Sequence, residues 1–505
     1  MYNKKVLIEM FLEDKARPNC AVVGVYGHPQ AALIAYYALH AQQHRGQEAS
    51  GISTFYYDET KKKMRYAYTR GEGLVLDVFS DSKIFTEVLI GSSAVGHNRY
   101  STTGSSTRAN IQPFNMTYHS GILSLAHNGN LTNTKSLRNK LIDEGTIFQT
   151  TTDSELFMHL IAHSRKKTHL EQIREALQIA HGAYSLVILT ENSLFAARDP
   201  HGVRPLSIGR IKLENNRYAY IVASETCAFD IVNAEYIRSV AHNEIIEIDN
   251  ETLETGKIKS YKIIDETPIA KHCIFEYIYF SRPDSKIFGH SVDKVRRKLG
   301  KYLALESPVP NEDDEKVFII PVPDSANTAA LGFAKKNSEQ GFPSSFEIGL
   351  IRSHYVGRTF IAPGQDNRVF RVKTKFNTVR GLIEGRHVVI VDDSIVRGTT
   401  SKALIKLIRE ANPKKISMRI ISPPIVSPCF YGMDFPSKEE LIANHYSSEQ
   451  EIAKAIGVDD LKYLSVSKLM ETVPYDDGID YCTACFTCNY PIPIEEEISK
   501  DSNEN

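Results

Sequence analysis

Two patterns of apolar residues divide the chain near residue 255. Before it, a run of apolar residues at 21–26 predicts a buried strand, and short strands separated by turn signals follow it. One helix is expected in this part, at 170–179, because apolar residues recur there near helical spacing and His181-Gly182 provides a stop.

After residue 255 the pattern changes to strands that alternate with helices. Strands are predicted at 317–320, 388–391 and 416–421, and a helix is predicted at 401–411. Such alternation favours a parallel sheet, because parallel strands need crossover connections. Residues 341–377, rich in Arg, Lys, Gly and Phe with little periodicity, predict a long functional loop, and the polar tail 491–505 is expected to be disordered.

The composition limits the classes of partner. A chain of 505 residues with 42% hydrophobic and 24% charged residues suits two globular domains. Its net charge of −1 gives no support for nucleic-acid binding, and no apolar run reaches membrane-spanning length. Charged residues scattered through 1–19 leave no signal-peptide core, so we expect a cytoplasmic protein that binds small anions. Seven widely spaced cysteines indicate metal binding or catalysis rather than a disulfide framework.

The most specific motif lies at 387–400 and reads HVVIVDDSIVRGTT. An apolar strand ends in two carboxylates, and a turn of small residues then leads into a helix whose N-terminal amides can bind a phosphate. A lone Asp-Asp pair after a strand more often only caps the next helix. A second strand, at 317–320, is followed by Pro-Val-Pro-Asp-Ser, which places Ser325 at a strand's carboxyl end.

This motif closely resembles the phosphoribosyl pyrophosphate signature of type I phosphoribosyltransferases. The resemblance implies a binding site for that substrate made by Ser325, Arg352, Arg358, Asp392, Asp393, Ser394, Arg397, Gly398, Thr399 and Thr400. It also implies that Ser325, Asp392 and Asp393 help to hold Mg²⁺. One departure is Arg352-Ser353-His354, where the family often has Lys-Asn-Arg.

The first half carries a second group of motifs, in which Cys20 is the first residue. A lone cysteine before a strand is usually a small buried residue, but here four further stretches follow it, at 43–47, 96–102, 126–130 and 152–155. In this order they resemble the class II glutamine amidotransferases, which have the N-terminal-nucleophile hydrolase fold. The resemblance implies that residues 1–19 are a propeptide and that the freed amino group of Cys20 acts as the base.

The same resemblance assigns the remaining roles in glutamine hydrolysis. Asn128 and the Gly129 amide would form the oxyanion hole. Arg99, Thr102 and Asp153 would bind glutamine. Three histidines near these motifs, His44, His97 and His127, fit a structural role equally well.

Four further cysteines form a constellation in the second half: Cys273, Cys429, Cys482 and Cys485. From the residues alone, four thiolates fit Zn²⁺ about as well as a [4Fe–4S] cluster. The sequence around them resembles the iron–sulfur subgroup of the amidophosphoribosyltransferase family, which favours the cluster, in a structural role. Cys488 could compete as a ligand, whereas Cys227 is expected to pack in the core.

The resemblance covers nearly all of 20–485 and implies a complete organisation. It predicts a propeptide (1–19), an αββα glutaminase domain (20–255), an α/β phosphoribosyltransferase domain with a mainly parallel sheet (256–480) and a cysteine-bearing segment with an acidic tail (481–505). The implied reaction turns phosphoribosyl pyrophosphate, glutamine and water into 5-phosphoribosylamine, glutamate and pyrophosphate, the first committed step of purine synthesis. A homodimer or homotetramer inhibited by purine nucleotides is expected, with no nucleic-acid or membrane partner.

Two other functions deserve comparison with this one. A different glutamine-dependent enzyme, such as a sugar-phosphate aminating enzyme or asparagine synthetase, would not explain the motif at 388–400. A regulatory protein that only senses phosphoribosyl pyrophosphate would have no need of Cys20, Arg99, Asn128 and Asp153 together.

Overall fold

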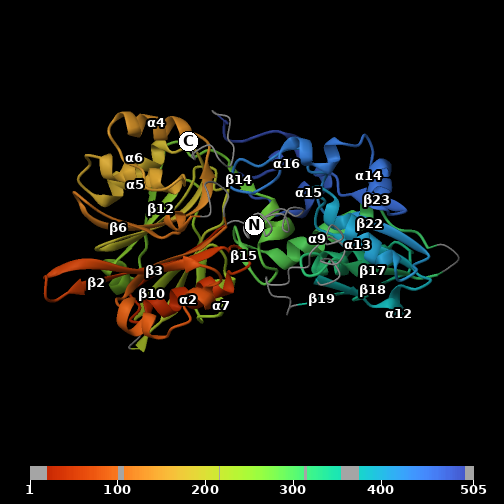
Figure 1. Ribbon diagram of the computed structural model, residues 1–505, viewed down its shortest axis with the longest axis horizontal. Coiled ribbons are helices and arrows are strands. Elements are labelled where there is room, and N and C mark those ends of the chain that lie inside the picture. The colour runs from red at the N-terminus through yellow and green to blue at the C-terminus, as the bar shows by residue number, and fades with distance from the viewer. Residues whose placement is uncertain (1–19, 101–106, 215–216, 312–314, 354–374, 495–505) are drawn as a thin grey trace, which may run out of the picture.

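The computed structural model describes residues 20–100, 107–214, 217–311, 315–353 and 375–494. They form two halves that lie side by side along the long axis of the molecule (Figure 1). Each half is built around its own sheets, so the change of pattern in the sequence corresponds to a change of architecture.

Two antiparallel sheets form the first half. The seven-stranded sheet has the order β11 (Glu235–Ser239), β9 (Ser207–Lys212), β10 (Tyr218–Ala223), β1 (Ala21–Tyr26), β4 (Ser93–Arg99), β2 (Ala49–Asp58) and β3 (Lys63–Glu72). The six-stranded sheet has the order β13 (Lys259–Lys262), β12 (Glu244–Asp249), β8 (Ser193–Arg198), β7 (Gly182–Thr190), β6 (Gly121–Leu131) and β5 (Phe114–Tyr118).

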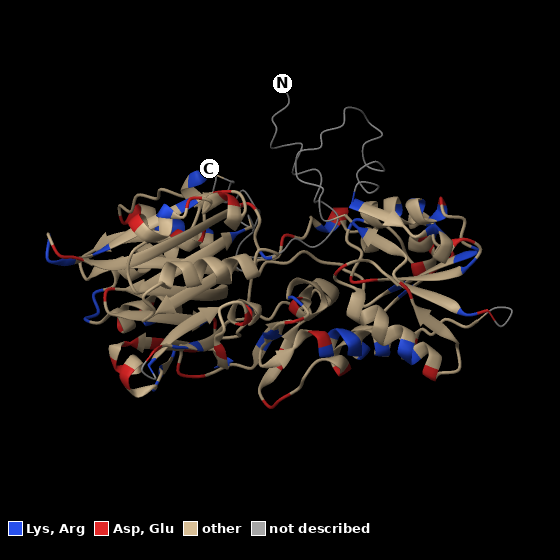
Figure 2. Cartoon of the chain, turned by 90° about the horizontal axis from the view of Figure 1, so that it is seen from below, with Lys and Arg blue, Asp and Glu red and all other residues tan. Residues whose placement is uncertain are grey.

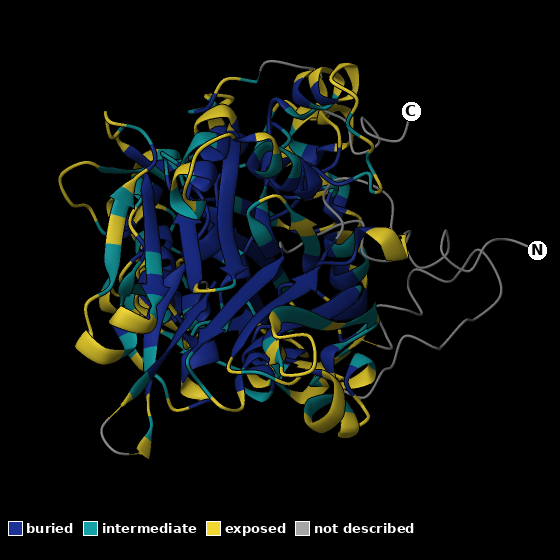
Figure 3. Cartoon of the chain, turned by 90° about the vertical axis from the view of Figure 1, so that its left-hand side faces the viewer, coloured by how far each residue is buried: buried dark blue, intermediate teal, exposed yellow. Residues whose placement is uncertain are grey.

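These sheets pack face to face, and helices cover their outer faces. Apolar residues of both sheets, among them Val22, Val95 and Val187, share one buried cluster between the layers. The outer face of the first sheet is covered by α2 (Ala31–Ala41), α3 (Val75–Val78) and α7 (Cys227–Asp230), and that of the second by α4 (Thr134–Asp143), α5 (Ser154–His163) and α6 (His169–Ile179). Buried strands lie inside and exposed helical surfaces outside (Figure 3), which confirms the predicted αββα sandwich.

The second half contains a five-stranded sheet in which every neighbouring pair is parallel. Its order is β18 (Ser344–Phe346), β17 (Val317–Pro321), β21 (His387–Asp392), β22 (Lys415–Ile420) and β23 (Asp460–Tyr463). Along β21, Val389 and Val391 face α9 (Val292–Glu306) and α10 (Asn327–Glu339), whereas Val388 and Ile390 face α13 (Thr399–Arg409) and α14 (Glu449–Ile456). The predicted parallel α/β domain is therefore confirmed.

Smaller elements connect the halves. β14 (Ala270–Cys273) pairs in parallel with β24 (Ile479–Cys482), which is followed by α16 (Ala484–Thr487), and these elements lie near the junction of the halves (Figure 1). A π-helical turn at Glu276–Phe280 comes directly after β14. The remaining short strands and α-helices of the described ranges are β15 (Lys286–Ile287), β16 (His290–Ser291), β19 (Leu350–Arg352), β20 (Phe376–Thr378), α8 (Asn250–Thr255), α12 (Arg380–Ile383) and α15 (Val466–Thr472).

Two expectations were wrong in part. The segment 341–377 contains the strands β18, β19 and the start of β20, each three residues long and therefore too short to show periodicity. In the tail, residues 491–494 are ordered, since Ile492 is buried and its backbone nitrogen and carbonyl both bond the Tyr431 hydroxyl. The predicted boundary at residue 255 stays a prediction, although the first half's sheet continues to β13.

Positive and negative residues are interspersed over both halves (Figure 2). Across the described ranges, none of the helices has the length and apolar character needed to cross a membrane.

Candidate active site

Cys20 lies immediately before β1, with its side chain buried between the sheets. Its Sγ donates a hydrogen bond to the backbone carbonyl of Tyr100 at 3.5 Å. Burial raises the pKa of the Cys20 thiol to about 11, against the opposing effects of that hydrogen bond and of the nearby Arg99 guanidinium. The thiol is therefore neutral at pH 7, and a base is needed to make it a nucleophile.

The pairing of β1 with β4 places Arg99 beside this thiol. Ala21 lies opposite Asn98 in the antiparallel register, so the next pair of positions is Cys20 and Arg99. Burial lowers the pKa of Arg99, while Cys20, Glu48 and Asp153 act in the opposite direction. One buried cation thus lies among anionic groups next to the thiol, an arrangement suited to a carboxylate or zwitterionic ligand.

Asn128 and Gly129 lie on β6 of the other sheet. Both polar atoms of the Asn128 side chain are buried, and neither has a hydrogen-bond partner in the described part of the chain. A buried amide without partners is costly, which makes it a candidate for ligand binding. Gly129 has φ +155°, and a Cβ there would lie 2.0 Å from the Ala183 carbonyl oxygen, so only glycine fits.

Asp153 and the histidines complete this region. Asp153 comes directly before α5 and accepts a 3.0 Å hydrogen bond from the backbone N–H of Leu131. His97 Nε2 lies 3.1 Å from the His127 carbonyl oxygen, and burial lowers the pKa of His97 to about 3. Such a ring is a poor base at neutral pH, which favours the structural interpretation of His97. Thr102 lies outside the described residues.

The second group of predicted residues meets at the carboxyl ends of β17 and β21. Asp392 ends β21, and Asp393 follows it with no exposed surface. The Asp393 carboxylate accepts hydrogen bonds from Ser325 Oγ at 2.5 Å and Ser394 Oγ at 2.7 Å. Two buried carboxylates with a neighbouring hydroxyl form a hard oxygen donor set, which fits Mg²⁺ shared with a phosphate ligand.

Gly398 connects these carboxylates to a helix. It has φ +79° and directly precedes α13, whose first residues are Thr399 and Thr400. A Cβ at Gly398 would lie 2.4 Å from Ile442 Cδ1. This eleven-residue helix therefore begins shortly after the carboxylates at the end of the sheet, as a phosphate site requires.

The predicted arginines are found in salt bridges or lie beyond the described ranges. Arg397 contacts Glu440 at 3.1 Å, and Arg352 contacts Asp324 at 2.9 Å. Both arginines lie near the carboxylate edge but are turned toward acidic partners, which a phosphate could displace. Arg358 lies outside the described residues.

The four predicted ligand cysteines converge between the halves. Cys273 lies opposite Cys482 in the β14–β24 register, and the Cys485 carbonyl accepts hydrogen bonds from Val426 at 2.9 Å and Ser427 at 3.2 Å, close to Cys429. As placed, no group of three or more His, Cys, Asp or Glu side chains in the described ranges could hold a metal ion.

The chemistry of these thiols nevertheless fits a metal. Burial raises the pKa of Cys273 to about 12, and burial together with the neighbouring thiols raises that of Cys485 well above its usual value. Thiolates in such a site need a cation to stabilise them. Cys488 is exposed with φ +60°, and Cys227 is buried in the core as predicted.

A buried ion network between the halves was not predicted. Arg45 contacts Glu225 and Glu276, and Arg204 contacts Glu276 at 3.3 Å. None of these four side chains is exposed. One signal was available: Glu276 is the only charged residue in the apolar stretch Cys273 to Phe280.

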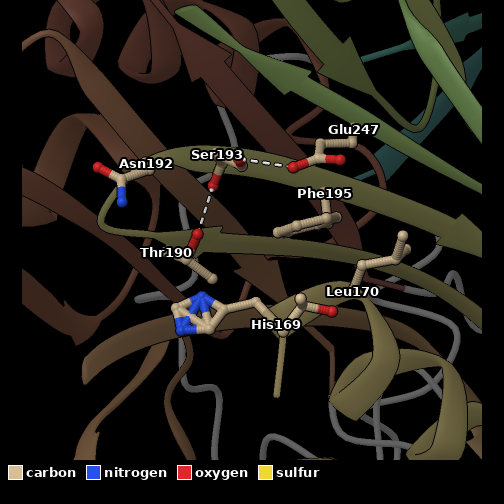
Figure 4. Close-up of a pocket in the computed structure, with 8 residues that line it drawn as sticks. His169, Leu170, Thr190, Asn192, Ser193, Phe195 and Glu247 are labelled. Atoms are coloured by element: carbon tan, nitrogen blue, oxygen red, sulfur yellow. Dashed lines mark hydrogen bonds between the residues drawn. The ribbon is translucent and has the colours of Figure 1, made fainter. Parts of the chain in front are cut away.

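A separate hollow of about 300 Å³ lies at the start of α6 and along β7, β8 and β12. His169, Phe195 and Glu247 are among its lining residues (Figure 4), and Ser193 Oγ donates to Glu247 at 2.8 Å. None of the residues that line this hollow is a predicted site residue, so we do not assign the candidate active site to it.

The chain is similar to known proteins along nearly its whole length. The model of a glutamine amidotransferase domain matches residues 97–230. The amidophosphoribosyltransferase of Bacillus subtilis is 44% identical over 483 residues, covering 95% of each chain, and a chloroplastic one from Glycine max is 47% identical over 485 residues, covering 96% of this chain and 80% of the relative.

A solved structure has the same architecture along nearly the whole chain. It is the glutamine phosphoribosylpyrophosphate amidotransferase from B. subtilis complexed with ADP and GMP, with a TM-score of 0.84 and 43% identity over 96% of this chain and 100% of that one. Identity at this level over nearly complete chains leaves no doubt of common descent. The chain therefore belongs to the amidophosphoribosyltransferase family.

Proposed function

We propose that this enzyme performs the family reaction in two half-reactions, with glutamine hydrolysed at Cys20 and ammonia added to phosphoribosyl pyrophosphate beside Asp392 and Asp393. The observation that carries the first assignment is the buried amide of Asn128, which has no hydrogen-bond partner among the described residues. Asn128 lies on β6, which contacts β1, directly after Cys20, and β4, which ends at Arg99. The second rests on the paired carboxylates next to the open helix N-terminus.

Glutamine hydrolysis would begin with removal of the Cys20 proton. In a chain cleaved before Cys20, the free α-amino group has a pKa near ~8 and can take that proton. The thiolate attacks the side-chain amide carbon of glutamine, and the oxyanion accepts hydrogen bonds from Asn128 Nδ2 and the Gly129 N–H. The proton passes to the leaving ammonia, and water then cleaves the thioester to give glutamate.

Arg99, Asp153 and Thr102 are proposed to select glutamine. Arg99 would bind the α-carboxylate, and Asp153 would bind the α-ammonium. Arg99 is buried among acidic groups, which supports recognition of a zwitterion over a simple amide.

In the second half-reaction, ammonia attacks C1 of the ribose and pyrophosphate leaves with the electrons of the C–O bond. Asp392 and Asp393 would bind the ribose diol, and the amides of residues 398–400 with their Thr hydroxyls would bind a phosphate. Mg²⁺ near Ser325, Asp392 and Asp393 would supply charge neutralisation for the leaving pyrophosphate. Ser394 and Arg397 are proposed as further contacts in this site.

The basic segment 351–377 is proposed to close over this substrate, and ammonia is proposed to pass internally between the sites. Arg352 and Arg358 would contact the pyrophosphate. If closure also completes the glutamine site, phosphoribosyl pyrophosphate must raise the rate of glutamate release. The variant Arg358→Ala should blunt that stimulation; equal glutamate release with and without the substrate in the wild type would show independent halves.

A structural [4Fe–4S] cluster is proposed on Cys273, Cys429, Cys482 and Cys485, with Zn²⁺ as the alternative occupant. Two of these thiols, Cys273 and Cys485, are buried and the other two are half-buried, which supports a metal, and the family resemblance of their sequence context favours iron. Purine nucleotides are proposed as inhibitors, since the B. subtilis structure contains ADP and GMP. A cytoplasmic homodimer or homotetramer is proposed, with residues 1–19 removed as a propeptide; light scattering and mass spectrometry test these points.

The direct test is an assay of each half-reaction in matched variants. Asn128→Ala should lower glutamate release by about a hundredfold or more, as loss of an oxyanion donor does, and spare synthesis from added ammonia. Asp393→Asn should abolish both the glutamine- and ammonia-dependent release of pyrophosphate. Full glutamate release by Asn128→Ala would refute the assignment of the oxyanion hole.

A further inference from the structure

The second half of the chain touches the proposed oxyanion hole directly, through the segment 430–432. Gly432 has φ +99°, and a Cβ placed on it would lie 3.0 Å from the carbonyl carbon and 3.1 Å from the carbonyl oxygen of Gly129. Gly129 also lies close to the Ala183 carbonyl oxygen, which would be 2.0 Å from a Cβ at residue 129. The backbone of β6 at Gly129 is thus in close contact with both β7 and residue 432.

The rest of the segment fixes this contact. The Phe430 carbonyl accepts a 3.0 Å hydrogen bond from Asn130 Nδ2, one residue beyond Gly129. The Tyr431 carbonyl accepts hydrogen bonds from the buried Arg204, at 3.0 Å from Nε and 2.6 Å from Nη2. Three successive residues of the second half therefore each contact the glutaminase half, on strand β6 or on the loop that carries Arg204.

The segment 430–432 is also held by contacts within the second half of the chain. Tyr431 is buried, its hydroxyl donates to the Ile492 carbonyl at 2.6 Å, and its backbone N–H donates to Cys429 Sγ at 3.4 Å. The position of Gly432 therefore depends on the C-terminal segment and on the loop that begins at Cys429. Because these bonds hold Tyr431, the backbone at Gly432 can set the position of its neighbour instead of following it.

We propose that Gly432 is a positioning residue for glutamine hydrolysis: the segment 430–432 holds the Gly129 peptide in the place where its N–H can stabilise the oxyanion. This rests on the proposed role of Gly129. Glycine is required at 432 because any side chain would push against the Gly129 backbone, which has no room to move toward Ala183. The transferase half would thereby contribute to the geometry of the glutaminase site without touching glutamine.

The test is the variant Gly432→Ala, with Gly478→Ala as its control. The added methyl must displace Gly129 by a few tenths of an ångström, and a displacement of 1 Å costs about a hundredfold in rate, so kcat for glutamate release should fall about three- to tenfold. The KM for glutamine should change little, because Arg99 and Asp153 are not moved. Gly478 has φ +79°, and no described residue lies within 4 Å of its Cβ position, so this control carries a comparable backbone strain and should keep the wild-type kcat.

Synthesis from added ammonia serves as the test of folding in each variant. If Gly432→Ala also loses synthesis from added ammonia, Asn130→Ala is the second test. This variant removes the hydrogen bond to the Phe430 carbonyl without adding volume, and it should also lower kcat for glutamate release. The proposal would be overturned if a folded Gly432→Ala variant kept the wild-type kcat for glutamate release. It would also be overturned if Asn130→Ala lowered glutamine-dependent and ammonia-dependent synthesis equally. If instead Asn128→Ala leaves glutamate release intact, the oxyanion-hole assignment itself fails, which is a separate result.

Discussion

Replacement of Glu276 by glutamine should destabilise the molecule strongly, because this carboxylate lies between two buried arginines. It contacts Arg45 and Arg204, and none of the three side chains is exposed. Arg45 retains Glu225 in the variant, and the carboxylates of Glu225 and Glu276 together keep the pKa of Arg45 above its ordinary value although burial acts to lower it. The hydrogen bonds from Arg204 to the Tyr431 carbonyl would remain, but a carbonyl cannot replace the negative charge of Glu276.

Breaking a buried ion pair by removing one partner costs about 3 to 5 kcal/mol, since the other charge remains desolvated. We therefore expect the free energy of unfolding, measured by urea denaturation at pH 7.5, to fall by about this amount in Glu276→Gln. The matched control is Glu235→Gln, because Glu235 pairs with Arg210 at 2.8 Å on the surface, and its loss should leave the urea midpoint unchanged. Equal midpoints for Glu276→Gln and wild type would refute the view that this network joins the halves.

Cys20, Gly398 and Cys482 can each be tested by a separate measurement. In protein that retains residues 1–19, the rate at which iodoacetamide alkylates Cys20 should be low at pH 7 and rise as the pH approaches about 11, because only the thiolate reacts. The rate is measured by peptide mass mapping. An inflection of the rate below pH 9 would contradict the raised pKa. Gly398→Ala should raise the KM for phosphoribosyl pyrophosphate about tenfold, because left-handed strain of ~1–2 kcal/mol and the contact with Ile442 would distort the phosphate site. Gly385→Ala, at φ +66° with no described atom within 4 Å of its Cβ position, is the control and should leave this KM unchanged. Equal KM values for the two variants would argue against the phosphate site. Anaerobically purified protein should contain iron and labile sulfide, and Cys482→Ser should lower its yield; stoichiometric zinc without iron would exclude the cluster.

The sequence predicted the strands and the helices that have a clear period. The apolar runs at 21–26 and 388–391 appear as β1 and β21, and the helix predicted at 170–179 is α6 (His169–Ile179). Each of these has a continuous or periodic pattern of its own, so local residues are sufficient to identify it. The strands β18 and β19 are only three residues long, and they depend on neighbours that the sequence does not bring together.

The candidate sites could be predicted where their residues belong to compact motifs, as at 387–400 and 126–130. The contacts between the halves could not. Glu276 and Arg45 lie 231 positions apart, and Gly432 meets Gly129 only because two separate folds are packed together. The fixed position of Ile492 could not be predicted for the same reason, since its hydrogen-bond partner Tyr431 lies in a loop that is distant in the sequence. Tertiary packing of this kind leaves no periodic signal in the chain.

We propose that one chain both makes ammonia at Cys20 and uses it beside Asp393. The most direct measurement supplies processed enzyme with phosphoribosyl pyrophosphate, Mg²⁺ and glutamine and follows glutamate and pyrophosphate together, for wild type and for Cys20→Ala with and without added ammonia. We expect equal amounts of both products from wild type. From Cys20→Ala we expect no glutamate at all but pyrophosphate whenever ammonia is added. Continued glutamate release by Cys20→Ala, or pyrophosphate release by wild type that does not depend on either nitrogen source, would contradict it.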